Sequence, residues 1–187
     1  MAQPNENVEP SNDSLKKTVV DAIEEYEDFP KPGIKFLDIF SVYRSKPAHE
    51  AFSLLLERYA VSVKNSIDAV VGLDSRGFLI GPLIARTIGK PFVPIRKKGK
   101  LPGPCHTVKY SLEYGTAEME IQTTALQKNA NVLVVDDLLA TGGTLEAACK
   151  LIKSCECNVF TCWVAIELVA LEGRKLVSSP VESLLQL

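Results

Sequence analysis

Two adjacent carboxylates and a turn of small residues offer the clearest chemistry in this chain. Asp136 and Asp137 directly follow four apolar residues, 132–135, and the Thr- and Gly-rich residues 140–144 come shortly after them. Carboxylates accept hydrogen bonds from sugar hydroxyls, and the N–H groups at the start of a helix bind phosphate. Ligands of parallel sheets bind where the strands end. The pattern therefore predicts a sugar-phosphate site after a buried strand.

Three other interpretations of this segment are weaker. A nucleotide-triphosphate loop needs a Lys beside its glycines, and this run has none. A response-regulator receiver domain places its acid pair near its start, and too little chain follows Asp137 for the remaining strand–helix units. A plain buried strand with ordinary helix capping does not need a second acid beside Asp136.

Residues 132–144 resemble the signature of the phosphoribosyltransferases that bind phosphoribosyl pyrophosphate: four apolar residues, two acids, two apolar residues and a Thr/Gly-rich turn. Relatives that use 6-oxopurines carry Asp at the position of Ala140, whereas the adenine-specific family carries Ala. Three further segments are similar to that family in order and spacing: residues 72–78, 96–104 and 110–115. The resemblance runs from about Phe29 to Leu185.

The resemblance implies transfer of a phosphoribosyl group from phosphoribosyl pyrophosphate to adenine, which gives AMP and pyrophosphate. It also implies Mg²⁺ carried by the pyrophosphate, with no metal site of the protein's own. Two alternatives stay open. One is a paralogue with altered base preference or weak activity. The other is a non-catalytic regulator that binds phosphoribosyl pyrophosphate, although such regulators add a basic DNA-binding module for which this chain has no spare segment.

The resemblance also assigns roles to single residues. Glu113 is the expected catalytic group at the imidazole edge of the purine, and Tyr114 closes over the site. Lys35 and Leu37 are expected to read adenine through their main chain, although many relatives carry an apolar residue and Arg there. The expected contacts to phosphoribosyl pyrophosphate and AMP are Arg76, Arg96, Lys97, Lys100, Asp136, Asp137, Ala140, Thr141, Gly142, Gly143 and Thr144.

Composition and charge narrow the class of protein. The chain has 187 residues and a net charge of −2, which suits one soluble domain and provides no basic field for nucleic acid. No apolar run approaches the ~20 residues that cross a bilayer, so we expect no membrane contact. The polar start does not look like a leader, and five cysteines without a disulfide pattern favour a reducing compartment. We therefore expect a cytoplasmic protein, and the resemblance implies a homodimer.

Apolar runs alternate with amphipathic stretches, which predicts an α/β fold with a parallel sheet. The expected strands are residues 67–73, 92–96, 106–110, 117–122, 132–135 and 159–166, with residues 34–39 extended. The expected helices are residues 13–25, 47–63, 76–88 and 145–154. We expect a flexible lead-in over residues 1–12 and one phosphoribosyltransferase domain over residues 13–187. The N-terminal segment and the C-terminal tail lie outside this alternation. The resemblance implies a type I core flanked by helices, with a small hood over the carboxyl edge of the sheet that is formed by about residues 13–40 and the C-terminal tail.

Overall fold

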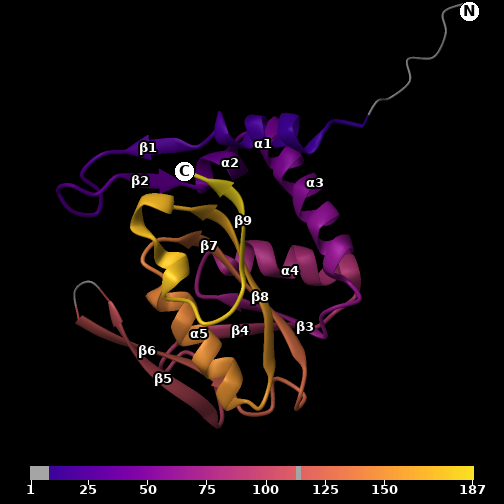
Figure 1. Ribbon diagram of the computed structural model, residues 1–187, viewed down its shortest axis with the longest axis vertical. Helices are drawn as coiled ribbons and strands as arrows, with labels where there is room; N and C mark the ends of the chain where they lie inside the picture. Colours follow the sequence, from indigo (N-terminus) through magenta and orange to yellow (C-terminus); the bar gives the residue numbers. More distant parts are fainter. Residues whose placement is uncertain (1–8, 113–114) are drawn as a thin grey trace, which may run out of the picture. The chain divides into compact units, whose positions relative to one another are not determined.

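The computed structural model describes residues 9–112 and 115–187 (Figure 1). The chain forms two compact units, Met1–Leu55 and Leu56–Leu187. No helix in the described ranges combines the length and the apolar character needed to cross a bilayer. The predicted single domain and the predicted position of its hood stay predictions.

The first unit combines helices with a small hairpin. Its elements are α1 (Asn12–Val20), β1 (Glu24–Tyr26), β2 (Phe36–Asp38), α2 (Phe40–Arg44) and the start of α3 (Lys46–Val63). The Ser11 hydroxyl accepts the Ser14 N–H at 3.2 Å, which satisfies one of the free N–H groups at the start of α1. Leu15 and Val19 bury one face of that helix. β1 and β2 pair antiparallel.

The second unit is built on a seven-stranded sheet with the order β5-β6-β4-β3-β7-β8-β9. Five of these strands are parallel, and the β5–β6 hairpin joins the β4 edge antiparallel. The elements are β3 (Ala69–Leu73), α4 (Gly77–Ile88), β4 (Phe92–Lys97), β5 (Cys105–Leu112), β6 (Gly115–Gln122), β7 (Asn131–Leu139), α5 (Gly143–Ser154), β8 (Asn158–Glu167), η1 (Val169–Leu171), η2 (Gly173–Lys175) and β9 (Val181–Gln186). The predicted α/β class with a mostly parallel sheet flanked by helices is confirmed.

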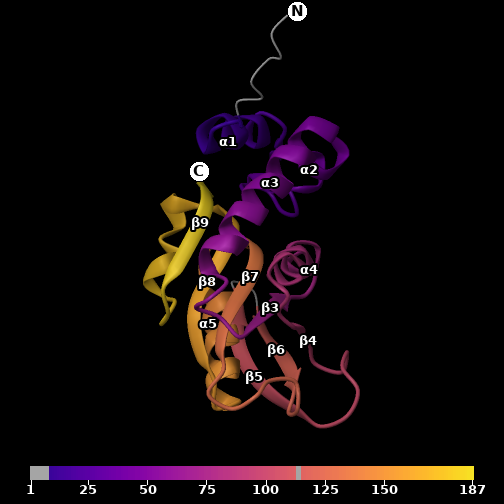
Figure 2. The same ribbon diagram turned by 90° about the vertical axis from the view of Figure 1, so that its right-hand side faces the viewer.

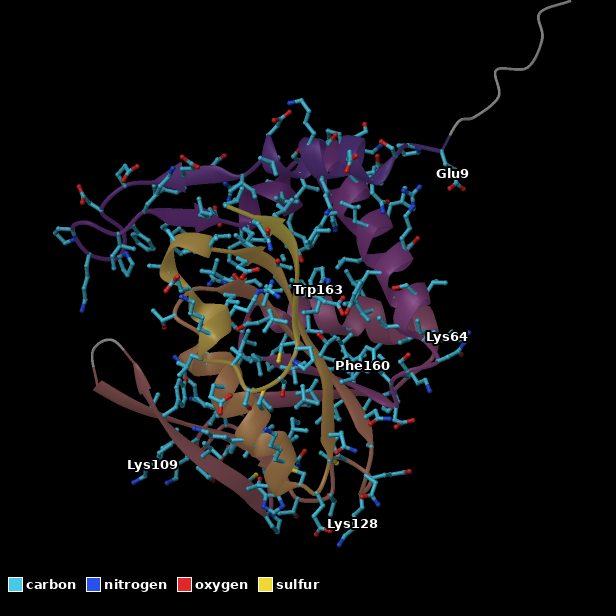
Figure 3. The ribbon with its side chains drawn as sticks, viewed as in Figure 1. Glu9, Lys64, Lys109, Lys128, Phe160 and Trp163 are labelled. Atoms are coloured by element: carbon cyan, nitrogen blue, oxygen red, sulfur yellow. The ribbon has the colours of Figure 1, made fainter. Side chains whose placement is uncertain are left out.

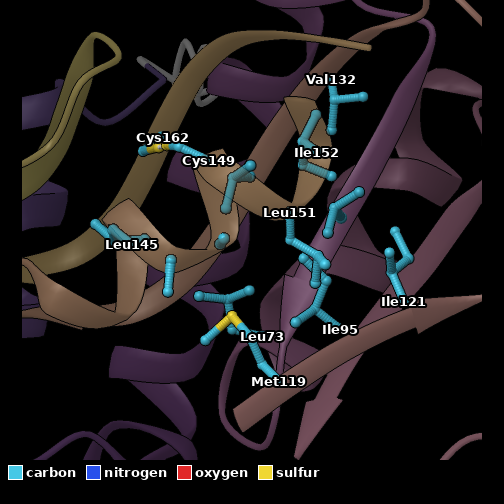
Figure 4. Close-up of a cluster of buried hydrophobic side chains, with 14 of the residues drawn as sticks. Leu73, Ile95, Met119, Ile121, Val132, Leu145, Cys149, Leu151, Ile152 and Cys162 are labelled. Atoms are coloured by element: carbon cyan, nitrogen blue, oxygen red, sulfur yellow. Dashed lines mark hydrogen bonds between the residues drawn. The ribbon is translucent and has the colours of Figure 1, made fainter. Parts of the chain in front are cut away.

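Helices α4 and α5 cover opposite faces of this sheet (Figure 2). Leu73 of β3 lies in the hydrophobic cluster that contains Leu151 of α5 (Figure 4). Its neighbour Gly72 faces α4, because a Cβ there would lie 2.7 Å from the Phe92 ring and 3.0 Å from the Gly77 carbonyl oxygen. Successive residues of a strand point to opposite faces, so α4 and α5 lie on opposite faces of the sheet. The direction in which the chain winds through the sheet therefore reverses between β3 and β7. Open α/β sheets bind their ligands at such a reversal.

Apolar and charged side chains separate clearly in the second unit. Leu145 and Ile152 of α5 are at most 1% exposed and pack on the sheet (Figure 4). Trp163 of β8 is 2% exposed, whereas Lys109 and Lys128 extend outward at the periphery (Figure 3). Close packing of this kind holds the strands in place, and with them the residues at the strand ends.

The C-terminal tail adds a strand to the sheet, so the expectation that it lies outside the alternation that builds the sheet is wrong. Its last strand, β9, pairs in parallel with β8 from Cys162↔Val181 to Glu167↔Gln186. The sequence conceals this strand because β9 is short, lies at the sheet edge and mixes polar with apolar residues on both faces. The turns η1 and η2 connect β8 to β9.

Further differences from expectation concern the first helix, α2 and β7. The first helix ends at Val20, because residues 24–26 pair with β2 instead of continuing the helix. Helix α2 was not expected, since five residues are too few to show helical periodicity. Strand β7 continues past both acids to Leu139, because β8 keeps pairing with it.

Candidate active site

The two acids lie where β7 keeps one neighbouring strand and loses the other. The ladder between β7 and β3 ends at Val135, while the ladder between β7 and β8 continues to Leu139. Asp136 and Asp137 therefore stand beside the crevice that opens between β3 and β7, where the winding reverses. This is the edge at which the sequence pattern predicts a ligand.

The phosphate loop, residues 140–144, connects β7 to α5. Gly142 has a φ of 86°, in the left-handed region that glycine adopts without strain, and its carbonyl accepts the Glu146 N–H at 2.9 Å. The first N–H groups of a helix have no partner within the helix. The residues that carry them line a cavity of about 210 Å³, together with Arg76 and residues 136–139. One cavity thus holds the acids, an arginine and the helix start.

Arg76 and the two acids form an asymmetric charge cluster. Arg76 Nε lies 2.7 Å from Asp137 Oδ2, and the Asp137 side chain is 8% exposed. Asp136 Oδ1 accepts the backbone N–H of Asp137 at 2.9 Å. Burial and the neighbouring Asp137 charge raise the pKa of Asp136 well above its ordinary value, as expected for two carboxylates that share a site. A hydroxyl donor or a cation would therefore stabilise the charged form of Asp136 more than that of Asp137.

Arg96 links the segments that follow β3 and β4. Its Nε donates to Asp74 Oδ2 at 3.1 Å, and its Nη1 donates to the Lys100 carbonyl at 3.2 Å. The guanidinium carbon lies 6.0 Å from the centroid of the Phe78 ring, within the range of a cation–π contact. Asp74 begins the loop that leads into α4, so Arg96 orients that loop as well as offering charge.

The lysines after β4 divide into a paired and an unpaired group. Lys98 Nζ lies 2.5 Å from Glu118 Oε2, and Glu118 also pairs with Lys109 at 3.3 Å. Neither Lys97 nor Lys100 has an ion-pair partner among residues 9–112 and 115–187. The two unpaired lysines are the ones that the resemblance assigns to phosphoribosyl pyrophosphate, and their charges are available to an anion.

Glu120 and Tyr110 support the site, and sequence analysis missed both. The Glu120 carboxylate is 5% exposed and accepts the N–H groups of Lys100 and Leu101 at 2.9 Å each. Burial acts to raise the pKa of Glu120, but the backbone donors outweigh it and the pKa is lowered. Burial raises the pKa of Tyr110, and the neighbouring Thr144 side chain offsets part of that rise. These partners are distant in sequence, so no local pattern signals them.

Lys35 and Leu37, expected to read adenine, lie in the first unit. Leu37 pairs with Glu25 across the β1–β2 hairpin and is 9% exposed. Lys35 Nζ lies 2.6 Å from Glu25 Oε2. The Lys35 charge therefore has a partner on its own hairpin, and recognition through the main chain does not require its side chain. Their role stays a prediction.

Glu113 and Tyr114 lie outside the described residues, so their assigned roles also stay predictions. In the part of the chain that the structure describes, no group of three or more His, Cys, Asp or Glu residues could hold a metal ion. All five cysteines are free. Mg²⁺ prefers phosphate oxygens and waters to a full protein cage, and Asp136 is the carboxylate that lines the cavity next to Asp137 and Arg76.

A second, more open depression lies in the first unit. Thr18, Ser41 and Arg44 are among its lining residues. Arg44 already forms ion pairs, because it lies 2.8 Å from Glu24 and 3.2 Å from Asp38. The depression therefore offers less to a charged ligand than the cavity between the acids and the phosphate loop.

An acid pair, a helix-start phosphate loop and adjacent basic side chains at the switch point define a phosphoribosyl-binding α/β protein. The family model described as "Phosphoribosyl transferase domain" matches residues 47–184. The adenine phosphoribosyltransferase of Homo sapiens is 48% identical over 176 residues, which cover 93% of this chain and 98% of that protein. The chain belongs to the phosphoribosyl transferase family and, within it, to the adenine phosphoribosyltransferases.

Solved structures agree with this placement. Adenine phosphoribosyltransferase from Saccharomyces cerevisiae, complexed with an imino-altritol bisphosphate and adenine, matches with a TM-score of 0.85 and 37% identity over 92% of this chain and 99% of that chain. The enzyme from Trypanosoma brucei, in complex with AMP, pyrophosphate and ribose-5-phosphate, matches with a TM-score of 0.81 and 27% identity over 94% of this chain and 81% of that chain.

Proposed function

We propose that this chain transfers the phosphoribosyl group of phosphoribosyl pyrophosphate to adenine, producing AMP and pyrophosphate in purine salvage. The observation that carries the proposal is the single cavity in which Asp136, Asp137 and Arg76 meet the phosphate loop. Relatives that share about half of the sequence are adenine phosphoribosyltransferases.

The phosphate loop would hold the 5′-phosphate. The backbone N–H groups of residues 140–144 and the hydroxyls of Thr141 and Thr144 supply donors, and the helix dipole favours an anion there by roughly 0.3–1 kcal/mol when exposed. Asp136 and Asp137 would accept from the ribose 2′- and 3′-hydroxyls. Their negative charge also favours the oxocarbenium-like transition state expected of glycosyl transfer.

The basic side chains would hold the pyrophosphate. Arg76 lines the cavity, Arg96 and Lys97 end β4, and Lys100 follows three residues later. Mg²⁺ would arrive on the phosphate oxygens and neutralise part of their charge. The paired Lys98 is not needed for this role, because Glu118 already compensates it.

Adenine recognition would come from two parts of the chain. Lys35 and Leu37 would offer main-chain groups to the base, and Glu113 would manage the proton at its imidazole edge while Tyr114 excludes water. A second candidate is an enzyme of the same family with a different base preference, because Lys35 and Leu37 stand where many relatives carry an apolar residue and Arg.

Incubation with Mg²⁺, phosphoribosyl pyrophosphate and each purine or pyrimidine base tests both candidates. We expect AMP and pyrophosphate with adenine and no nucleotide with the other bases. Product from another base at a comparable rate would favour the second candidate. If no base gave nucleotide and pyrophosphate, the enzyme proposal would be wrong.

We further propose a homodimer in the cytoplasm. The resemblance implies that part of the basic cluster serves the partner's site, and five free cysteines suit a reducing compartment. Light scattering after gel filtration should give twice the 20.5 kDa chain mass, and a monomer would contradict the dimer. Microscopy of the labelled chain tests the location.

A further inference from the structure

The connection between β8 and β9 lies directly against the phosphate loop. We call residues 168–176 of this connection the brace turn; it contains η1 and η2. The Leu168 N–H donates to the Leu139 carbonyl at 2.9 Å, so the brace turn starts beside the last residue of β7. Among the described residues that line the cavity, none belongs to the brace turn. It therefore touches the loop without being placed to touch the ligand.

Two glycines make the contact between the brace turn and the loop. A Cβ on Gly173 would lie 2.1 Å from the Ala140 carbonyl oxygen and 2.9 Å from Gly142 N. A Cβ on Gly142 would lie 2.2 Å from the Gly173 carbonyl oxygen. Side chains do not fit at such distances, so the two backbones pack directly on one another. Gly173 is not among the residues with positive φ, so it provides room rather than an unusual conformation.

A forked ion pair holds the brace turn to the sheet. Arg174 Nε donates to Glu167 Oε1 at 2.9 Å and Nη2 donates to Oε2 at 2.5 Å, while Nη1 donates to the Val181 carbonyl. The Ser183 hydroxyl donates to Glu167 Oε2 at 2.6 Å. Glu167 is 5% exposed. Bidentate pairs of this kind fix orientation as well as distance.

The connection is also tied to the helix on the far side of the loop. The Ser178 N–H donates to Glu146 Oε2 at 2.7 Å, and Glu146 lies in the first turn of α5. The connection thus bonds to the end of β7 through Leu168 and to the start of α5 through Ser178. The phosphate loop is the segment between those two points.

We propose that Gly173 and the Glu167–Arg174 pair are positioning residues for phosphate binding. This proposal rests on the function proposed above. The brace turn fixes the backbone at residues 140–142, so the loop N–H groups converge on one phosphate before the ligand arrives. Preorganised donors of this type bind without the cost of ordering the loop.

The phosphate selectivity of Gly173→Ala tests the proposal. The added methyl must displace Ala140 or Gly142, since both contacts are backbone atoms. An inserted methyl group in a tightly packed place shifts the backbone around it, so we expect the dissociation constants for AMP and for ribose 5-phosphate to be about tenfold larger. Adenosine, which lacks the phosphate, should bind as it does to the unmodified chain. Titration calorimetry or competition measurements give the three constants.

Gly81→Ala is the matched control. Gly81 lies within α4, and its Cβ would lie 2.5 Å from the ring of Phe92 at the start of β4, so the substitution strains the same unit away from the loop. We expect the control to leave the ratio of AMP to adenosine affinity unchanged, even where its melting temperature falls. A merely structural role of Gly173 would give the same result for both variants.

Arg174→Lys keeps the charge but removes the fork, and it provides a second route if Gly173→Ala does not fold. We expect a smaller loss of AMP affinity, again with adenosine unaffected. If the variant that folds keeps the original AMP-to-adenosine ratio, the proposal is wrong. If the unmodified chain itself shows no preference for AMP over adenosine, the phosphate placement in the proposed function fails instead.

Discussion

Asp136 on β7 and Glu167 on β8 are acids on neighbouring parallel strands, yet their surroundings differ. Glu167 accepts from Arg174, Ser183 and Gln186, and the hydrogen bond from Arg174 contributes most to lowering its pKa to about 2. Asp136 lies beside another acid, and burial together with that charge raises its pKa. The first carboxylate accepts from three side chains of the protein, whereas the second accepts the Asp137 N–H and lies beside a like charge.

The difference separates structural from ligand-binding acids at one sheet edge. A carboxylate with a complete set of donors gains little from a ligand, while one held next to a like charge gains from any hydroxyl or cation that arrives. Asp137 stands between these cases, because Arg76 already pairs with it at 2.7 Å. Of the three acids, Asp136 is therefore the one whose negative charge a ligand's hydroxyl or cation would stabilise most.

The largest effect is expected at Glu113, because we expect this residue to transfer a proton in the reaction rather than to bind phosphoribosyl pyrophosphate. Glu113→Gln should lower kcat by roughly 10²–10⁴-fold, the usual contribution of a general acid or base. The dissociation constant for phosphoribosyl pyrophosphate should stay the same, which equilibrium binding measures. Unchanged turnover would remove Glu113 from the mechanism.

Asp136→Asn sharpens the comparison by removing the unsatisfied charge. Hydrogen bonds to charged groups contribute about 1.5–3 kcal/mol, so AMP and phosphoribosyl pyrophosphate should each bind roughly ten- to a hundredfold more weakly. The free energy of unfolding should nevertheless rise at pH 7. Because folding raises the pKa of Asp136, the folded protein is destabilised as pH increases from the ordinary value through the raised one.

Two measurements check the Asp136→Asn prediction. Calorimetric titration gives the affinities, and thermal unfolding at pH 7 and at lower pH gives the stability difference. The gain in stability should shrink on acidification, because the carboxyl of the unmodified chain then takes up a proton. A variant that is less stable at pH 7 would contradict the assignment of Asp136 as the unsatisfied acid.

Glu167→Gln should have the opposite effect on stability. Loss of the charged bonds should lower the free energy of unfolding by about 1–2 kcal/mol, a modest value because the Arg174 side chain is 43% exposed. The stabilisation from a lowered pKa is fully present above the ordinary value of 4.5 and disappears as pH falls toward about 2.

Urea unfolding at several pH values checks the Glu167→Gln prediction. The difference from the unmodified chain should be largest near pH 7 and should diminish below about 4.5. Glu156→Gln is the control, since Glu156 pairs with Lys128 at 2.9 Å with both side chains at least 65% exposed, and exposed pairs contribute little. Equal effects of the two substitutions would remove the distinction between the acids.

The smallest effects are expected at the lysines. Lys97→Ala should weaken phosphoribosyl pyrophosphate binding by only a few fold, as expected for one exposed charge in water, and more at low salt than at high salt. Lys98→Ala should leave the affinity unchanged, because Glu118 compensates that charge. Binding titrations at two salt concentrations compare the variants. A larger loss from Lys98→Ala would reverse the assignment.

The sequence predicts the parts of the site that are contiguous. The acids, the phosphate loop and the following helix occupy one run, so a single pattern places them together, and apolar alternation predicts the parallel sheet. The pairing of Arg76 with Asp137 is not visible in the sequence, since the two residues lie on different strand–helix units. The sequence cannot show which lysine finds a partner, because Glu118 reaches Lys98 through the pairing of β4 with β6.

Long-range supports were not predictable for the same reason. Gly173 has no local turn signature that would connect it with residues 140–142, and the contact exists only because β9 returns beside β8. The mixed polarity of β9 hides it from periodicity. Glu120 likewise looks like an ordinary strand acid until the segment after β4 folds over it.

The unequal pairing of β7 predicts two rates of amide exchange along one strand. Residues 132–135 are bonded to strands on both sides, whereas residues 136–139 keep only β8 in the ladder. Local opening is easiest where backbone bonds are fewest. Deuterium should therefore enter the acid-bearing end of β7 well before its buried half, and occupation of the crevice should slow exchange mainly at that end. The exchange rate of the backbone amides at that end of β7 would then show whether a ligand is bound.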